Sequence, residues 1–457
     1  MISEGKPQMP IAALRPRGEG QQVVLYGDSC SGVAGALHER KLAEVNAVIR
    51  RLAPQPEFII FPGDEIIGLC ADPAELRAQW RHFLDVEMAW LDRAATPIWH
   101  TTGNHTAYDA MSEKVFKEVL QLPRNGPPGQ EGLSYFVRRG EILMVFVHTL
   151  WTGLGGEGHV ETDWLADVLR QHRAARHKLV IGHHPVHPVN GFEAPYQREI
   201  GPEHAGRLWD ILVEEGVLAY LCSHILAFDV QVHRGVLQIC SAGAGTAHRM
   251  PEGVEYVHCV QAALDSQGLR YQVLDNGGEL RERLEWPMPE IGEGAWRTLP
   301  EGLIEAAWSG GAPRVPYLAL RFTGEAARAG EARAQTLLAA FEASSLPSLW
   351  VGLTGEVQRL TVILGREAAR SPHYWFGRSV LPGEAFDIEL VVNPDMGPGG
   401  LLARDAGDRR WSSLSGASAH GAERLDWPRR WSVGHGPAGA QDRPFAGADF
   451  RAMVAIA

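Results

Sequence analysis

The sequence predicts an α/β layered domain followed by an all-β domain. From residue 21 to about 275, short apolar runs alternate with amphipathic stretches of helical length, which is the pattern of layered α/β folds. From residue 316 to 457, alternating strand patterns and Gly- and Pro-rich turns dominate. The length of 457 residues also exceeds the roughly 250 to 300 residues at which chains begin to split into domains.

The elements of the first domain follow one another in a regular order. Six apolar runs of strand length come first, at residues 23–26, 58–61, 98–101, 143–148, 179–181 and 218–222. Between them, three stretches place apolar residues at helical spacing: 37–52, 74–91 and 161–172. After residue 224, further strands are predicted at 229–233, 236–241, 256–263 and 269–274. A second sheet built from these strands would close the domain as a sandwich with helices outside.

The domain limits follow from shifts in composition. Residues 1–20 are predicted to be an N-terminal extension, 21–275 the α/β domain, 276–315 a linker rich in Gly, Glu and Pro, and 316–457 the β-domain. In the β-domain, strands are expected at 317–322, 348–353, 360–364, 374–380, 386–392 and 450–456. One Ala-rich stretch, 325–343, is predicted to be a helix.

Composition excludes several classes of protein. A net charge of −12 argues against nucleic acid as a partner, because that binding needs clustered Lys and Arg. No segment approaches the roughly 20 apolar residues of a membrane span, so no membrane partner is expected. Five scattered cysteines do not form a disulfide framework, and residues 1–20 lack the apolar core of a secretory signal. A cytoplasmic location is therefore predicted.

Polar residues follow five of the apolar runs at the point where each run ends. These residues are Asp28, Asp64, Asn104, His183 and His224. Because loops at the carboxyl ends of strands converge at one edge of a sheet, we expect them to meet. Carboxylate, amide oxygen and imidazole are metal ligands, so the last four residues supply one complete set of ligands for an ion.

The motifs around these residues resemble those of the calcineurin-like metallophosphoesterases, the family that includes purple acid phosphatases and cyclic-nucleotide phosphodiesterases. The resemblance covers residues 21–275 and rests on Asp28-Ser29-Cys30, Gly63-Asp64, Gly103-Asn104-His105, Gly182-His183-His184-Pro185 and Ser223-His224-Ile225-Leu226. It implies a four-layer αββα sandwich that binds one or two Mn, Fe or Zn ions. It also implies hydrolysis of a small-molecule phosphate monoester or diester by a metal-bound hydroxide.

The resemblance assigns metal ligands residue by residue. Asp64 would bridge two metals, and Asn104, His183 and His224 would complete one of the two sites. The other site would take Asp28 and Asp64.

This second site departs from the family pattern at two positions. Cys30 stands where the family has a histidine, and its thiolate could still bind zinc or iron. Leu226 stands where the family has another histidine, and it cannot coordinate a metal. The second site is therefore predicted to bind its ion weakly, and the enzyme could be mononuclear.

His105 resembles the family's catalytic histidine, which stabilises the phosphoryl group or protonates the leaving oxygen. Its usual acidic neighbour is replaced by Thr106, and Asp109 is the nearest carboxylate in sequence that could take over. Five further histidines are interpreted as packed or solvent-facing: His148, His184, His187, His233 and His248. Of these, His187 is the one that could also contact substrate, because it follows the His183 loop closely enough to reach a bound phosphate.

The β-domain loosely resembles a concanavalin-like or laminin-G-like jelly roll. This resemblance implies a β-sandwich that could bind carbohydrate or pack on the catalytic domain. Its tryptophans allow two interpretations, as core residues, which is favoured, or as a carbohydrate platform: Trp350, Trp375, Trp411, Trp427 and Trp431.

Three functions remain open from sequence. The leading hypothesis is a metal-dependent phosphoester hydrolase with one complete and one degraded metal site. The alternative is a catalytically retired relative that binds a phosphorylated or glycan ligand, because Cys30, Thr106 and Leu226 all depart from the family at the place of chemistry. The third is a mononuclear enzyme turned to a different ester or to an oxidative reaction.

Overall fold

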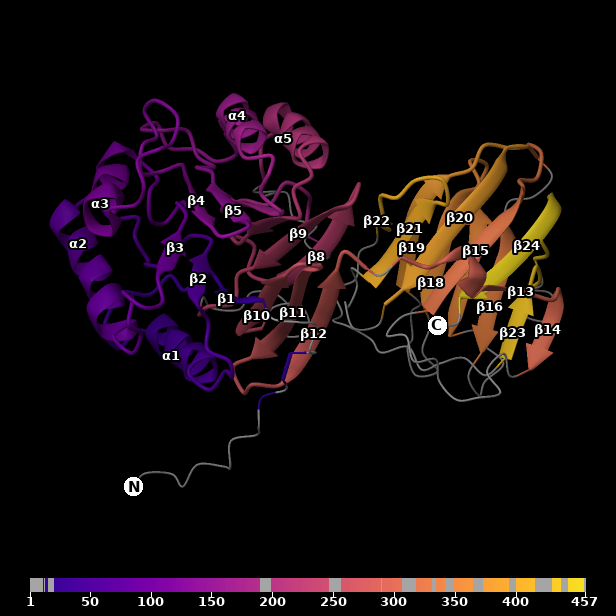
Figure 1. The fold of residues 1–457 in the computed structure, drawn as a ribbon, viewed down its shortest axis with the longest axis horizontal. Coiled ribbons are helices and arrows are strands. Elements are labelled where there is room, and N and C mark those ends of the chain that lie inside the picture. Colours follow the sequence, from indigo (N-terminus) through magenta and orange to yellow (C-terminus); the bar gives the residue numbers. More distant parts are fainter. Residues whose placement is uncertain are drawn as a thin grey trace, which may run out of the picture. The chain divides into compact units, whose positions relative to one another are not determined.

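The computed structural model describes residues 11, 13–14, 20–189, 199–245, 256–288, 290–305, 318–330, 334–341, 348–364, 373–393, 400–415, 430–436 and 443–455. The chain forms two compact units: Met1–Val230 with Val236–Met288, and Gln231–Gly235 with Pro289–Ala457 (Figure 1). Nearly all of the predicted extension 1–20 lies outside the described residues. Among the helices that the structure describes, none is long and apolar enough to cross a membrane.

The first unit contains two six-stranded sheets, in the orders β12-β11-β10-β1-β2-β3 and β4-β5-β6-β7-β9-β8. Strands β1, β2 and β3 are parallel in the first sheet, and β5, β6, β7 and β9 are parallel in the second. The strands are β1 (Gln21–Leu25), β2 (Phe58–Phe61), β3 (Ile98–His100), β4 (Tyr135–Arg139), β5 (Ile142–Phe146), β6 (His177–Ile181), β7 (Ala219–Cys222), β8 (Phe228–His233), β9 (Val236–Ser241), β10 (His258–Asp265), β11 (Gly268–Asp275) and β12 (Leu280–Trp286).

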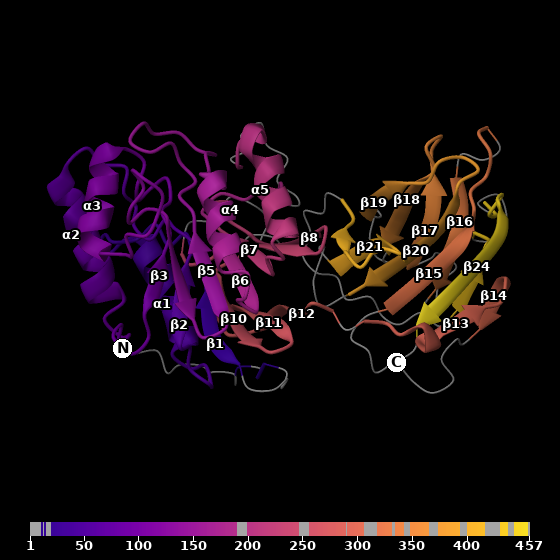
Figure 2. The ribbon, with the colours of Figure 1, turned by 45° about the horizontal axis from the view of Figure 1, so that its top comes forward.

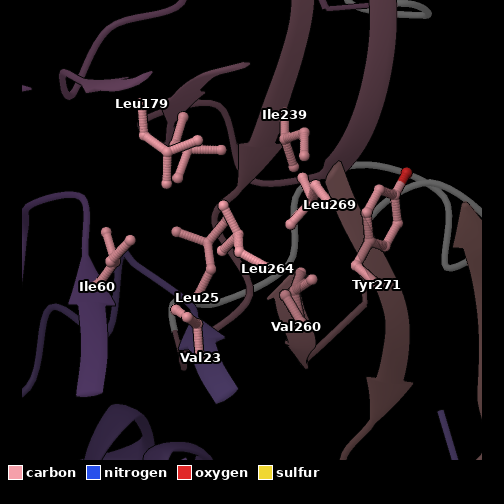
Figure 3. Close-up of a pocket in the computed structure, with 11 residues that line it drawn as sticks. Val23, Leu25, Ile60, Leu179, Ile239, Val260, Leu264, Leu269 and Tyr271 are labelled. Atoms are coloured by element: carbon pink, nitrogen blue, oxygen red, sulfur yellow. The ribbon is translucent and has the colours of Figure 1, made fainter. Parts of the chain in front are cut away.

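The two sheets face each other across an apolar core. Alternate residues of β1, Val23 and Leu25, point into this core, where they line a small cavity together with Leu179 of β6 and Ile239 of β9 (Figure 3). The cavity has a volume of about 20 Å³. Because its lining is apolar, it has no partners for a water molecule and is expected to be dry.

Helices cover the outer face of each sheet. Helices α1 (Leu37–Ile49), α2 (Pro73–His82) and α3 (Ala110–Leu120) lie beside the first sheet, and α4 (Thr162–Gln171) and α5 (Pro202–Glu214) beside the second (Figures 1 and 2). On the first face, Phe61 of β2 meets Phe83, whose ring also packs on Trp80 of α2. On the second face, β-strand and helix side chains form one buried cluster: Val180, Tyr220, Leu165, Leu169, Leu208 and Trp209. The predicted αββα architecture is thus confirmed.

Local sequence signals explain where α2 and α3 begin. Asp72 caps α2, with Pro73 at the first helical position, where the missing N–H is not needed. Asp109 caps α3: its carboxylate accepts the Ser112 N–H at 2.8 Å, and the Ser112 hydroxyl accepts the Asp109 N–H at 2.9 Å. Helix α2 then runs into a π-helical turn at Phe83–Glu87.

The second unit is a sandwich of two antiparallel six-stranded sheets, in the orders β13-β24-β15-β20-β21-β22 and β14-β23-β16-β17-β18-β19. Residues of both sheets share one buried core that includes Leu320, Phe322, Leu338, Val351 and Trp431. The strands are β13 (Trp296–Leu299), β14 (Gly302–Glu305), β15 (Leu318–Glu325), β16 (Ala334–Phe341), β17 (Leu349–Thr354), β18 (Arg359–Leu364), β19 (His373–Ser379), β20 (Ala385–Val392), β21 (Leu401–Asp405), β22 (Ser412–Ser413), β23 (Arg430–Val433) and β24 (Ala448–Ala455).

The tryptophans of this unit lie where the core interpretation expects them. Trp375, Trp411 and Trp431 are buried, and the half-buried Trp350 donates its indole N–H to the Thr336 hydroxyl at 3.1 Å. Trp427 lies outside the described residues. Carbohydrate binding by this unit stays a prediction.

Two stretches differ from the sequence prediction. The helix expected at 325–343 is wrong, because residues 334–341 form strand β16, paired with β17 and β23. Seven of its eight residues are buried, so packing on both faces of a sheet overrides the helix propensity of alanine and leucine. The stretch 276–315, expected to be a linker, contains β12, β13 and β14.

Candidate metal centre

The predicted site residues lie at the carboxyl ends of parallel strands in both sheets. Asp28, Asp64 and Asn104 follow β1, β2 and β3 of the first sheet, whereas His183 and His224 follow β6 and β7 of the second. In parallel sheets, ligands bind at the carboxyl ends of the strands. Here both facing sheets contribute site residues from these ends.

Four of these side chains converge on one point. The Nε2 atom of His183 lies 3.1 Å from Asp64 Oδ2, 3.1 Å from Asn104 Oδ1 and 3.1 Å from His224 Nδ1. The other ring nitrogen, Nδ1, donates to the Pro62 carbonyl at 2.8 Å, which orients the ring and leaves Nε2 facing the cluster. The structure thus brings together the four residues predicted to hold one ion, and their role as ligands stays a prediction.

The backbone around the cluster is shaped by unusual conformations. Asp28, Cys30, Asp64 and His224 have φ values of 59°, 41°, 56° and 70°. Positive φ is uncommon for residues with a side chain, and such strain gathers at functional sites.

Two glycines let the loops approach closely. A Cβ at Gly103 would overlap the Asp64 carboxylate. At Gly63, where φ is 99°, a Cβ would lie 2.6 Å from His183 Nδ1, so only glycine fits without moving a ligand.

The cluster concentrates buried negative charge. Burial, together with the neighbouring Asp64, raises the pKa of Asp28 to about 6. Burial also opposes the ionisation of Asp64, but His183 and the His105 backbone N–H outweigh it and hold the pKa of that carboxyl below its usual value.

The same charges act on His183 in the opposite direction. Burial alone would lower the pKa of His183, but Asp64 and Asp28 outweigh it and raise that pKa to about 10. The buried carboxylates therefore favour a positive charge at this point. The His183 proton supplies that charge, and a divalent cation would take the place of the proton. The donor atoms and this charge together fit a metal ion.

Asp28, in the first motif, accepts hydrogen bonds from the last motif, at Ser223 and His224. Its Oδ2 accepts a hydrogen bond from the backbone N–H of His224 at 2.7 Å and another from the Ser223 hydroxyl. Cys30 is buried, and its sulfur belongs to a second group of possible ligand atoms with Asp64 and His105, all within 4.8 Å of one another. Leu226, half-buried, offers no donor atom.

The position of His105 is fixed by Asp64 and by the loop that contains Ile67. Its backbone N–H donates to Asp64 Oδ1 at 2.9 Å, and its ring Nδ1 donates to the Ile67 carbonyl at 2.7 Å. The suggestion that Asp109 holds this ring is wrong, because the Asp109 carboxylate caps α3. Thr106 also has a local task, since its hydroxyl accepts the Gly103 N–H at 2.9 Å.

Two further residues join the site. His184, interpreted from sequence as a packing residue, forms a group of possible ligands with His183 and His224, whose atoms lie within 4.8 Å of one another. Glu157, which the sequence did not single out, lies 3.8 Å from His184 Nε2 and 4.0 Å from His224 Nε2. By contrast, the ring of His187 packs edge-on against Trp209, 4.4 Å between centroids.

The two facing sheets with helices outside form a mixed α/β metallophosphoesterase domain. The family model described as calcineurin-like phosphoesterase matches residues 23–228 of this chain. Members of the family are generally metal-dependent phosphoester hydrolases. Comparison with curated proteins gives no match.

Solved structures give distant likenesses. Purple acid phosphatase PPD1 from yellow lupin (Lupinus luteus) is 15% identical over 58% of this chain and 53% of its own length, with a TM-score of 0.44. A dimetal phosphatase from Danio rerio is 16% identical over 58% of this chain and 98% of its own, with a TM-score of 0.42. GAP50, described as the anchor in the inner membrane complex of Plasmodium, is 14% identical over 59% and 89%, with a TM-score of 0.42.

Proposed function

We propose that this chain is a metal-dependent phosphoester hydrolase acting on a small-molecule phosphate monoester or diester. The observation that carries the proposal is the convergence of Asp64, Asn104 and His224 at 3.1 Å from His183 Nε2. These four residues would hold one Mn, Fe or Zn ion. A bound ion supplies Lewis-acid stabilisation of phosphoryl charge and acidity for a water nucleophile.

His105 is the proposed general acid. Because its Nδ1–H is bound to the Ile67 carbonyl, Nε2 is the nitrogen that can exchange a proton with the substrate. In hydrolysis, the bond between phosphorus and the leaving oxygen breaks, and that oxygen takes a proton from Nε2 of the His105 imidazolium. Water supplies the hydroxyl that phosphorus gains, and the proton that water releases restores the imidazolium. The Ile67 carbonyl fixes the tautomer here, as a carboxylate would.

The test uses purified protein loaded with manganese, iron or zinc and a nitrophenyl phosphate monoester or diester. Asn104→Ala and His224→Ala should abolish hydrolysis and lower metal content, whereas His105→Gln should lower kcat and leave metal content unchanged. Asn125→Ala is the control, because Asn125 is exposed and bonds the Phe136 backbone. Hydrolysis that persists in both Asn104→Ala and His224→Ala would refute the proposal.

A catalytically retired relative that binds a phosphorylated or glycan ligand is the second candidate. It is favoured by the departures at Cys30 and Leu226, which leave the Asp28 side of the site short of ligands, and by Thr106, which replaces the acidic neighbour of His105. The double variant Cys30→His with Leu226→His separates the two candidates. Activity gained from zero supports the retired protein, and loss of an existing activity supports the hydrolase.

A further inference from the structure

The two nitrogens of the His224 ring face different sets of side chains. Nδ1 faces His183 Nε2 at 3.1 Å, inside the cluster already described. Nε2 faces the Glu157 carboxylate at 4.0 Å, and the same oxygen lies 3.8 Å from His184 Nε2. The ring centroids of His184 and His224 are 4.4 Å apart, so the two rings lie beside the same carboxylate oxygen.

The ring of His184 is held in the orientation that a metal ligand needs. Its Nδ1 lies 2.7 Å from the Thr149 hydroxyl. When Nδ1–H donates to that hydroxyl, Nε2 carries the lone pair and faces Glu157, which is the arrangement common among metal-binding histidines. The side chain is fully buried, so the ring has little freedom to turn away.

The loop that carries Glu157 is attached to the strand ends of the second sheet. Leu150 and Glu157 form an antiparallel bridge, and Gly158 donates to the Thr149 carbonyl at 2.8 Å. The Glu157 side chain is 24% exposed. It is therefore held near the two histidines by its backbone while its carboxylate can still move.

The distances from the Glu157 carboxylate to the two histidine rings suit a shared cation better than direct hydrogen bonds. At 3.8 and 4.0 Å, the carboxylate oxygen lies beyond hydrogen-bond distance of both nitrogens. Ligands bound at about 2.1 Å to a tetrahedral cation lie about 3.4 Å from one another, so Glu157 would need to approach each nitrogen by roughly half an ångström.

We propose that His184 Nε2, His224 Nε2 and the Glu157 carboxylate form a second cation position, adjacent to the one held by Asp64, Asn104 and His183. Its imidazole-rich ligands select a transition-metal ion of the zinc or cobalt kind. With both cations present, His224 would offer one ring nitrogen to each of them, and its ring proton would pass to solvent.

His184 follows β6, and Glu157 lies in the loop after β5. The proposed position is therefore built from the second sheet and differs from the Asp28 side of the site, where Leu226 offers no ligand. Because His224 is shared, the proposal rests on the first cation site of the proposed function.

The test is the number of cobalt(II) ions bound by the full chain, measured by elemental analysis and by the visible absorption of the bound ion. The wild-type protein should bind two equivalents. Glu157→Gln should bind the second equivalent at least tenfold more weakly and lose its absorption, while the first is retained. Glu161→Gln is the matched control, because Glu161 lies in the same loop and contacts His159, and it should bind two.

The outcomes separate the two proposals. If Asn104→Ala loses one equivalent but Glu157→Gln keeps both, the second position is overturned and the first stands. If Asn104→Ala loses nothing, the first site fails, and wild-type protein that binds no cobalt overturns both. His184→Gln provides an independent variant, and a melting temperature near that of wild type shows that it is folded.

Discussion

The conformation of Gly63 gives the sharpest prediction about the first cation site. Its φ of 99° lies where L side chains are strained, and an added Cβ would lie 2.6 Å from His183 Nδ1, against 3.4 Å for an ordinary contact. In Gly63→Ala, the His183 ring must therefore move by about 0.8 Å. Metal–ligand distances tolerate about 0.2 Å, so His183 can no longer bind together with Asp64 and Asn104.

We expect Gly63→Ala to weaken zinc binding at this site by about 100-fold, or close to 2.7 kcal/mol, as measured by competition with a chromophoric chelator. The backbone strain should also cost about 1 to 2 kcal/mol of folding stability. Gly216→Ala is the control, since Gly216 has a φ of 63° and nothing lies within 4 Å of its added Cβ. The Gly216→Ala variant therefore has the backbone strain of a positive φ but no clash with a neighbouring side chain.

Equal zinc affinity in Gly63→Ala and Gly216→Ala would contradict a role for His183 as a ligand. It would mean that the His183 ring can be displaced without loss, and thus that it is not a ligand. A loss of stability alone, similar in both variants, would be the signature of backbone strain only.

Three further predictions concern stability. Leu25→Ala enlarges the cavity between the sheets (Figure 3). It should lower the free energy of unfolding by about 3 kcal/mol, as measured by urea denaturation. A loss below about 1 kcal/mol would contradict close packing around Leu25. Burial lowers the pKa of His148 from 6.5 to about 3, so the unfolded chain takes up a proton that the folded chain refuses, and stability is lost as pH falls from 6.5 towards 3. His148→Gln should flatten that pH dependence, and an unchanged slope would contradict the assignment. Arg321 binds Asp387 through two hydrogen bonds of 2.8 Å, so Arg321→Lys should cost about 1 kcal/mol, whereas an unchanged melting temperature would count against it.

The strands that carry the site were readable from sequence because they are buried on both faces. Residues 58–61 form β2 with the predicted limits, and all four are buried. Parallel strands covered by helices and a facing sheet appear as continuous apolar runs, which are easy to locate. Because each run ends at the same edge, the meeting of Asp64, Asn104 and His183 could be expected without a structure.

Other elements were not predicted, for physical reasons that differ from case to case. The sequence of β16 predicts a helix because its alanines and leucines have high helix propensity. Pairing with β17 and β23 makes this segment a strand. Helix α5 has the required apolar positions, Leu208, Trp209, Ile211 and Leu212, but was not singled out.

The additional residues of the site illustrate what sequence spacing cannot give. His184 stands inside a predicted motif, yet its direction depends on the Thr149 hydroxyl, which lies 35 positions earlier. Glu157 lies in a loop whose path is set by glycines with positive φ, Gly153, Gly155, Gly156 and Gly158. No periodicity relates such a loop to the strands, so its approach to His224 appears only in three dimensions.

The most direct test of the central claim is the position of bound zinc in a crystal of the full chain, located by anomalous diffraction at the zinc edge. We expect a zinc peak about 2.1 Å from Asp64 Oδ2, Asn104 Oδ1, His183 Nε2 and His224 Nδ1. A crystal soaked at saturating zinc with no peak among these four atoms, or with His183 still bound directly to Asp64, would contradict it.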